Sequence, residues 1–181
     1  MRFSIFICLF FCISFFTCIK AQEKVDNYSF FKLCVTNDKD EVLLIGGEDW
    51  WEVTGSRYNQ PISVSEFVEW MGKRMGVEIE NVRLRGVFTF FYDWHKYKRP
   101  TLMQYYTADY KSGEPIVPDG CQYIKWVARK DLKEYIPYNE MVMILDKLNQ
   151  NNDLVGGSLL IEKTEDGRRK GKLIEDFYKL N

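Results

Sequence analysis

The chain has 181 residues, of which 25 are basic and 26 acidic, and its formal net charge at pH 7 is −1. This length suits one domain with a buried core. A charge so close to zero provides no global attraction to nucleic acid or to an anionic membrane, so we expect neither as a partner of the folded part. Aromatic residues make up 16% of the sequence, which predicts an aromatic-rich core.

Residues 1–21 have the pattern of a signal peptide. Arg2 precedes an apolar run over residues 3–19, and Ala21 offers a small residue at a cleavage point. We therefore expect a secreted or periplasmic protein that meets the membrane only through this segment. The alternatives are a retained anchor, because the run is long enough to span a bilayer, and a lipoprotein acylated at Cys18. Cleavage would leave 23 basic and 26 acidic residues and a net charge of −3.

Two cysteines, Cys34 and Cys121, lie outside this segment. They could pair in an oxidising compartment, but we favour two separate thiols. No Cys/His cluster is present, and His95 is the only histidine, which excludes a His-rich metal site.

The rest of the sequence predicts a domain over residues 22–150 and a C-terminal hairpin extension over 151–181. Strands are expected at 29–36, 41–45, 50–53, 82–91, 101–110, 122–128, 159–163 and 170–174, with an irregular loop at 54–61. Asp166-Gly167 is a hairpin turn signal between the last two strands. Strands interrupted by helices predict the α/β (α+β) class, with a mixed sheet and flanking helices.

The clearest helix follows the loop at 54–61. Ser63 and Glu66 form a capping-box pattern, and Gly76 stands where a helix often ends. One apolar face is predicted by the helical spacing of Val64, Phe67, Val68, Met71 and Met75. A second helix is expected at 139–148, with Met141, Ile144, Leu145 and Leu148 on one side.

This arrangement resembles the Nudix hydrolase family. The family's box reads Gly-x5-Glu-x7-Arg-Glu-U-x-Glu-Glu-x-Gly-U, where U is aliphatic, and its framework positions fall on Gly55, Met71 and Gly76-Val77 without a gap. Trp51-Glu52-Val53 is similar to the lead-in to the box, and residues 123–132 resemble the segment after the family's sheet. The resemblance covers residues 28–148 and implies a Nudix-like fold, with the C-terminal hairpin outside the core pattern.

The functional positions of the box depart from the family pattern. Its glutamates correspond to Pro61, Trp70 and Lys73-Arg74, and its arginine corresponds to Glu69. The family uses these carboxylates to hold Mg²⁺ or Mn²⁺, which activates water against a diphosphate. Because ammonium and guanidinium groups repel such a cation, the resemblance implies loss of the standard pyrophosphohydrolase mechanism, with no metal site and no cofactor.

We therefore expect a Nudix-fold protein that binds a nucleotide-like or other anionic small molecule, or a partner. The expected ligand-binding residues are Gly55, Arg57, Trp70, Lys73 and Arg74.

The alternative is a divergent hydrolase of nucleoside diphosphate derivatives. It would use Mg²⁺ or Mn²⁺ with a rearranged set of carboxylates drawn from Glu66, Glu69 and Glu140. A third hypothesis is a structural interaction module with an added sheet edge in the hairpin.

Overall fold

The computed structural model describes residues 29–94 and 100–180. The predicted signal peptide over 1–21, the lipidation alternative at Cys18, and His95 lie outside the described residues. The elements in chain order are β1 (Ser29–Thr36), β2 (Glu41–Gly46), β3 (Trp51–Arg57), α2 (Val64–Arg74), β4 (Val77–Tyr92), β5 (Thr101–Gly113), β6 (Tyr123–Ala128), η1 (Arg129–Asp131), α3 (Leu132–Tyr135), α4 (Asn139–Gln150), β7 (Val155–Lys163) and β8 (Arg169–Lys179).

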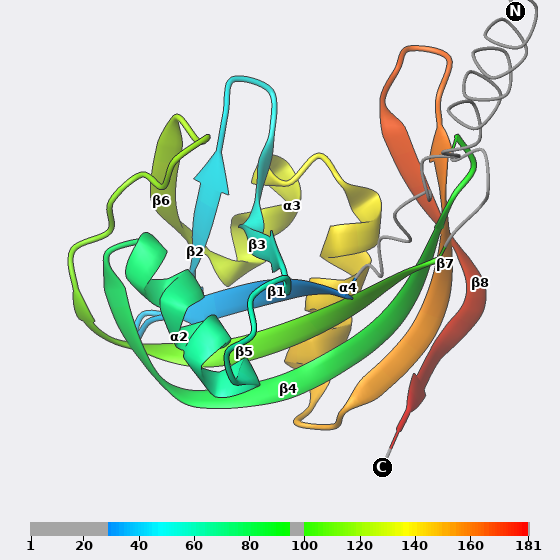
Figure 1. Ribbon diagram of the computed structural model, residues 1–181. Coiled ribbons are helices and arrows are strands. Elements are labelled where there is room, and N and C mark those ends of the chain that lie inside the picture. Colours follow the sequence, from blue (N-terminus) through cyan, green and yellow to red (C-terminus); the bar gives the residue numbers. More distant parts are fainter. Residues whose placement is uncertain (1–28, 95–99, 181) are drawn as a thin grey trace, which may run out of the picture.

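The strands form an eight-stranded sheet in the order β6-β2-β3-β1-β5-β4-β7-β8 (Figure 1). The β1–β5 and β4–β7 pairs are parallel and the other pairs are antiparallel. The predicted mixed sheet with flanking helices is thus confirmed.

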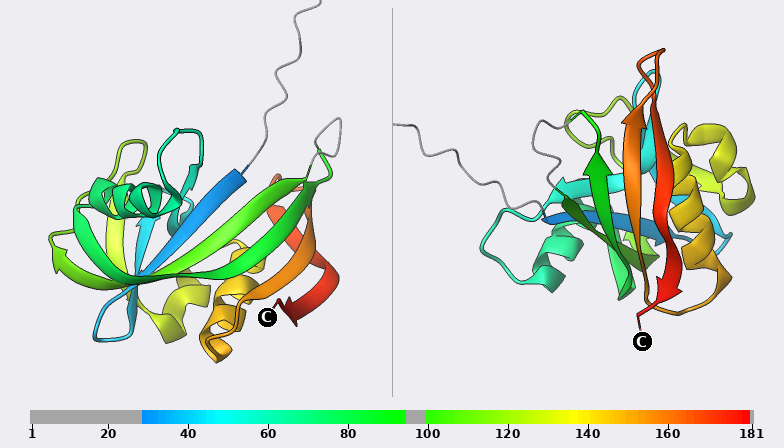
Figure 2. Two further views of the ribbon diagram at one scale, coloured as in Figure 1. Left: turned by 60° about the horizontal axis from the view of Figure 1, so that its bottom comes forward. Right: turned by 90° about the vertical axis from the view of Figure 1, so that its right-hand side faces the viewer.

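The two long helices cover opposite faces of the sheet, as Figure 2 shows. Strand β1 serves both faces because successive side chains of a strand point in opposite directions. Phe31, Leu33 and Val35 pack in the cluster beneath α2, whereas Phe30 and Cys34 belong to the cluster beneath α4. The core is therefore divided into two parts by the sheet.

Helix α2 begins and ends as its sequence predicts. The Ser63 hydroxyl accepts from the backbone N–H of Glu66, and the Glu66 side chain accepts from the backbone N–H of Ser63. Phe67, Val68 and Met71 are buried as expected, but Val64 in the first turn is 42% exposed. The predicted inward face of α4 (Met141, Ile144, Leu145 and Leu148) is entirely buried.

Five strands, β3, β4, β5, β7 and β8, extend further than the sequence predicts. The expected loop over 54–61 is wrong in its first half, because β3 continues to Arg57 through pairing with β1. Strand β4 runs without a break from Val77. Polar residues interrupt the strand pattern of its sequence, and the pairing with β5 shifts register near Glu80 and Leu84, as at a β-bulge.

The C-terminal hairpin is part of the same sheet. Strand β7 pairs with β4 over seven residues, and β8 continues to Lys179, beyond the expected end at residue 174. Val155, Leu159 and Ile161 are buried in the cluster beneath α4. No helix within the described ranges is long and apolar enough to cross a membrane.

Gly76 ends α2 in a left-handed conformation, with φ +74°, and a Cβ atom there would lie 2.3 Å from the carbonyl oxygen of Glu114. Gly120 has a similar φ of +82° but no neighbouring atom within 4 Å of the corresponding position. We expect Gly120→Ala to lower the free energy of unfolding by about 1 kcal/mol through backbone strain alone. Gly76→Ala adds a clash with backbone, so its loss should be about 3 kcal/mol.

Urea unfolding of the two variants beside the parent protein measures both losses. Equal losses would show that the backbone at Glu114 accommodates the added methyl group without a cost in stability.

Candidate functional site

The box-derived residues on α2 form a cationic and aromatic surface. The Arg74 guanidinium lies 4.9 Å from the centre of the Trp70 ring, and Trp70 packs against Phe67 with ring centres 5.1 Å apart. The stacking shows that Trp70 and Arg74 support each other on the helix.

Both acidic residues of α2 are exposed. Glu66 is exposed and accepts hydrogen bonds from the Ser63 hydroxyl at 2.7 Å and from the Ser63 backbone N–H at 2.9 Å. These hydrogen bonds hold the pKa of Glu66 below its usual range. Glu69 is exposed as well. Glu66 therefore serves as a helix cap, and Glu69 lies on the exposed surface of the helix.

The residues present do not fit the divalent cation that the Nudix box implies. The matching helix positions carry an indole, an ammonium and a guanidinium group, none of which ligates a hard cation. Across residues 29–94 and 100–180, no group of three or more His, Cys, Asp or Glu side chains could hold a metal ion.

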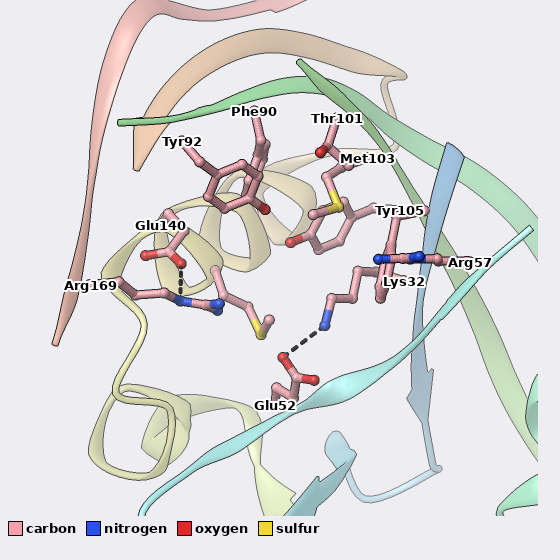
Figure 3. Close-up of a pocket in the computed structure, with 12 residues that line it drawn as sticks. Lys32, Glu52, Arg57, Phe90, Tyr92, Thr101, Met103, Tyr105, Glu140 and Arg169 are labelled. Atoms are coloured by element: carbon pink, nitrogen blue, oxygen red, sulfur yellow. Dashed lines mark hydrogen bonds and ion pairs between the residues drawn. The ribbon is translucent and has the colours of Figure 1, made fainter. Parts of the chain in front are cut away.

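A cavity of about 320 Å³ lies on the other face of the sheet, beside the start of α4 (Figure 3). Its walls come from β1, β3, β4, β5, α4 and β8, and they consist of Phe30, Lys32, Glu52, Arg57, Phe90, Tyr92, Thr101, Met103, Tyr105, Glu140, Met141 and Arg169. The cavity therefore combines aromatic and apolar walls with five charged side chains.

One charged side of the cavity is formed by β1 and β3. Lys32 is only 5% exposed, and its ammonium group donates to Glu52 Oε2 at 2.8 Å. Arg57 lies beside Lys32, as Figure 3 shows. Gly55 makes this arrangement possible, because a Cβ atom there would lie 2.9 Å from the end of the Lys32 side chain.

The opposite side is formed by α4 and the C-terminal hairpin. Glu140 is 2% exposed, and its Oε1 lies 2.9 Å from Arg169 Nε of β8. This pair is close but lacks hydrogen-bond geometry, and Glu140 Oε2 is buried without a hydrogen-bond partner among the described residues. The Arg169 guanidinium also stacks 3.6 Å from the centre of the Tyr138 ring. The hairpin thus supplies the cation that balances a buried carboxylate.

Two phenols complete the polar lining. Burial raises the pKa of Tyr92 to about 12 and raises that of Tyr105 well above its usual value. Both hydroxyls point toward the cavity interior in Figure 3. They therefore remain protonated at neutral pH and can donate hydrogen bonds to a ligand.

The structure separates the residues selected from the sequence into two groups. Arg57 and Glu140 line the cavity, and Gly55 shapes its wall. Trp70, Lys73 and Arg74 lie on α2, over the opposite face, and line neither this cavity nor any of three further hollows among the described residues.

Sequence reasoning missed Lys32, Glu52 and Arg169. Lys32 carried a usable signal, because a lysine within the apolar run of β1 must find a buried partner. Arg169 gave no such signal, since its position against Glu140 depends on the packing of the hairpin beside α4.

The two cysteines are free thiols. Cys34 belongs to the cluster beneath α4, and Cys121 packs against the cluster beneath α2, so the sheet lies between them. Burial raises the pKa of both thiols. The favoured hypothesis of two separate thiols is confirmed.

Compared by sequence alone, the chain matches no family model and no curated protein. Compared by structure, it is similar to the mutator MutT protein from Bacillus halodurans, with a TM-score of 0.67 and 18% identity over 81% of this chain and 97% of that one. An ADP-ribose pyrophosphatase from Streptococcus suis matches with a TM-score of 0.55 and 14% identity, over 73% of this chain and 98% of that one. A C. elegans Ap4A hydrolase matches with a TM-score of 0.52 and 18% identity, over 67% and 96%.

These structures share their architecture with this chain. Because the sequence identities are low, the similarity supports a common fold only. The mixed sheet between two helices and the box glycines at the expected places agree with that likeness. The chain therefore has the fold of the Nudix hydrolases.

Proposed function

We propose that this chain is a Nudix-fold binding protein that holds an anionic, nucleotide-like small molecule in the cavity beside α4. The observation that carries the proposal is the charge of the cavity wall, where Lys32, Arg57 and Arg169 outnumber Glu52 and Glu140. Charge-assisted hydrogen bonds from guanidinium groups suit the carboxylate or phosphate oxygens of such a ligand.

The remaining walls suit the other part of such a ligand. Phe30, Phe90 and Met103 offer apolar surface for a planar ring, and the Tyr92 and Tyr105 hydroxyls offer donors. Structures with the same fold include an ADP-ribose pyrophosphatase and an Ap4A hydrolase, which act on nucleotides by name. Nucleotide-like compounds are therefore the first to test.

The proposal includes loss of the standard metal-dependent mechanism. Lys73 and Arg74 replace the paired glutamates of the box, and the cavity carboxylates are already engaged, Glu52 by Lys32 and Glu140 by Arg169. Binding a divalent cation at either acid would break an ion pair whose other member is partly or fully buried, which is costly. As part of the same proposal, a cleaved segment over 1–21 would direct the protein to the periplasm or the exterior.

A divergent hydrolase is the second candidate, because Glu140 is a buried acid in the cavity wall. Burial beside a ligand site is the usual setting of a catalytic carboxyl group. Glu66 and Glu69 are the alternative acids on α2.

Binding can be tested with Arg57→Gln. Arg57 is exposed at the cavity rim, so its loss should leave the fold intact while it removes one charge-assisted hydrogen bond. We expect the Kd for ADP or ADP-ribose, measured by calorimetry, to rise about threefold to tenfold. Adenosine, which lacks the anionic group, should bind more weakly and respond less to the substitution.

Arg74→Gln is the matched variant on α2. If ligand affinity falls in Arg74→Gln and not in Arg57→Gln, the binding site lies on the surface of Trp70, Lys73 and Arg74 instead of in the cavity.

Hydrolysis can be tested directly with nucleoside diphosphate derivatives in the presence of Mg²⁺ or Mn²⁺. We expect no product above that of buffer alone, because the helix offers no set of metal ligands. Turnover that Glu66→Gln or Glu69→Gln abolishes would establish a rearranged site on α2, and turnover lost only in Glu140→Gln would place the acid in the cavity.

A further inference from the structure

A second hollow, of about 350 Å³, lies on the same face of the sheet at the other end of α4. Three arginines line it: Arg83 and Arg85 from β4, and Arg129 from the segment after β6. Among the described residues that line this hollow, Asp109 supplies the one carboxylate. The hollow is therefore strongly basic in a chain whose net charge is −1.

The strand register sets the width of this hollow. Thr107 of β5 pairs with Cys34 of β1 on one side and with Arg83 of β4 on the other. Neighbouring strands lie about 4.8 Å apart, so β1 and β4 are separated by about 10 Å across this row. Thr107 therefore lies on the floor of the hollow. Arg83 lies on one side of it, on β4, and Arg129 lies on the other side, beyond β1.

The Arg85 side chain is fixed by the end of α4. It donates to the carbonyl oxygens of Leu148 at 2.8 Å and Asp153 at 3.2 Å, and also to that of Asn151. These acceptors carry partial charges only, so the guanidinium charge is not neutralised by them. Burial, with a contribution from nearby Arg83, lowers the pKa of Arg85, as expected where positive charges are close together.

The positive charges of the other two arginines, Arg83 and Arg129, are only weakly offset by acidic side chains. Arg129 donates to the Thr36 hydroxyl at 3.2 Å and to Asp40 at 2.7 Å, but the Asp40 side chain is 70% exposed and its charge is largely screened by water. Within the described ranges, Arg83 has no hydrogen bond or ion pair. The Asp109 carboxylate accepts from Asn81 Nδ2 at 2.8 Å, so it does not pair with an arginine here.

We propose that this hollow is a phosphate site, with Arg83 and Arg129 binding a phosphate group from opposite sides above Thr107. Guanidinium groups bind phosphate oxygens in a planar, often bidentate geometry, and a threonine hydroxyl can donate to a third oxygen. The volume exceeds that of one phosphate group, so the site accommodates inorganic phosphate or a small phosphomonoester. The site is distinct from the cavity beside Glu140 and does not rest on the function proposed for that cavity.

The test is titration of the protein with inorganic phosphate at constant ionic strength, followed by ¹H–¹⁵N NMR. We expect saturable shifts at the amides of Thr107 and Asn149, and a Kd about tenfold higher in Arg83→Gln, since one charged donor is lost. Arg83 is exposed, so this variant should fold. Arg168→Gln is the matched control, because Arg168 is 84% exposed at the hairpin tip and should leave the Kd unchanged.

A parallel titration with glycerol 3-phosphate distinguishes a phosphomonoester from inorganic phosphate as the ligand. Tighter binding of the ester supports a phosphorylated small molecule, and equal binding supports free phosphate. The proposal is overturned if neither compound gives saturable shifts, if Arg83→Gln binds phosphate like the parent protein, or if Arg168→Gln loses as much affinity as Arg83→Gln.

Discussion

The pairing of β1 with β5 is the constraint on which the rest of the structure depends. The two strands are parallel and in register from Ser29↔Leu102 to Thr36↔Asp109, with β3 on the other side of β1. A shift of one residue would exchange the two faces of β1 and move Phe31, Leu33 and Val35 out of the core beneath α2. The hydrophobic free energy of those side chains therefore also fixes where the other face places Lys32, Cys34 and Thr36. Both hollows on the α4 face follow from this register.

The same register explains why the cavity is charged at all. Lys32 lies on the face of β1 that α4 leaves partly open, and a buried ammonium group is tolerated there because Glu52 lies 2.8 Å away. Glu140 is stable in the opposite wall only because β8 brings Arg169 to it, with Tyr138 stacked beneath the guanidinium. The cavity therefore requires the C-terminal hairpin, which lies outside the part of the sequence that resembles the Nudix family.

The sequence predicted local structure well where that structure depends on residues close by in the chain. The Ser63–Glu66 capping box, the left-handed Gly76 and the inward face of α4 depend on neighbours within a few residues, and all are present. The extension of β3 to Arg57 depends on pairing with β1, more than 20 residues away in sequence, and no local pattern contains that information. The site was harder for the same reason. The box directed attention to α2, whereas Arg57 and Glu140 line a cavity with Lys32 and Arg169, which the family pattern does not mark.

Helix α4 contributes residues to both hollows. Its first turn contributes Glu140 and Met141 to the cavity, and its last turns contribute Leu145 and Leu148 to the basic hollow. The C-terminal end of a helix carries a partial negative charge equivalent to about half an elementary charge, so one cation is enough to balance it. Arg85 already does this through the carbonyl oxygens of the final turn. Helix termination therefore accounts for Arg85, and the contacts with Thr36 and Asp40 hold Arg129, whereas Arg83 has no hydrogen bond or ion pair with the described residues. An anion bound between Arg83 and Arg129, as proposed above, would give Arg83 a partner.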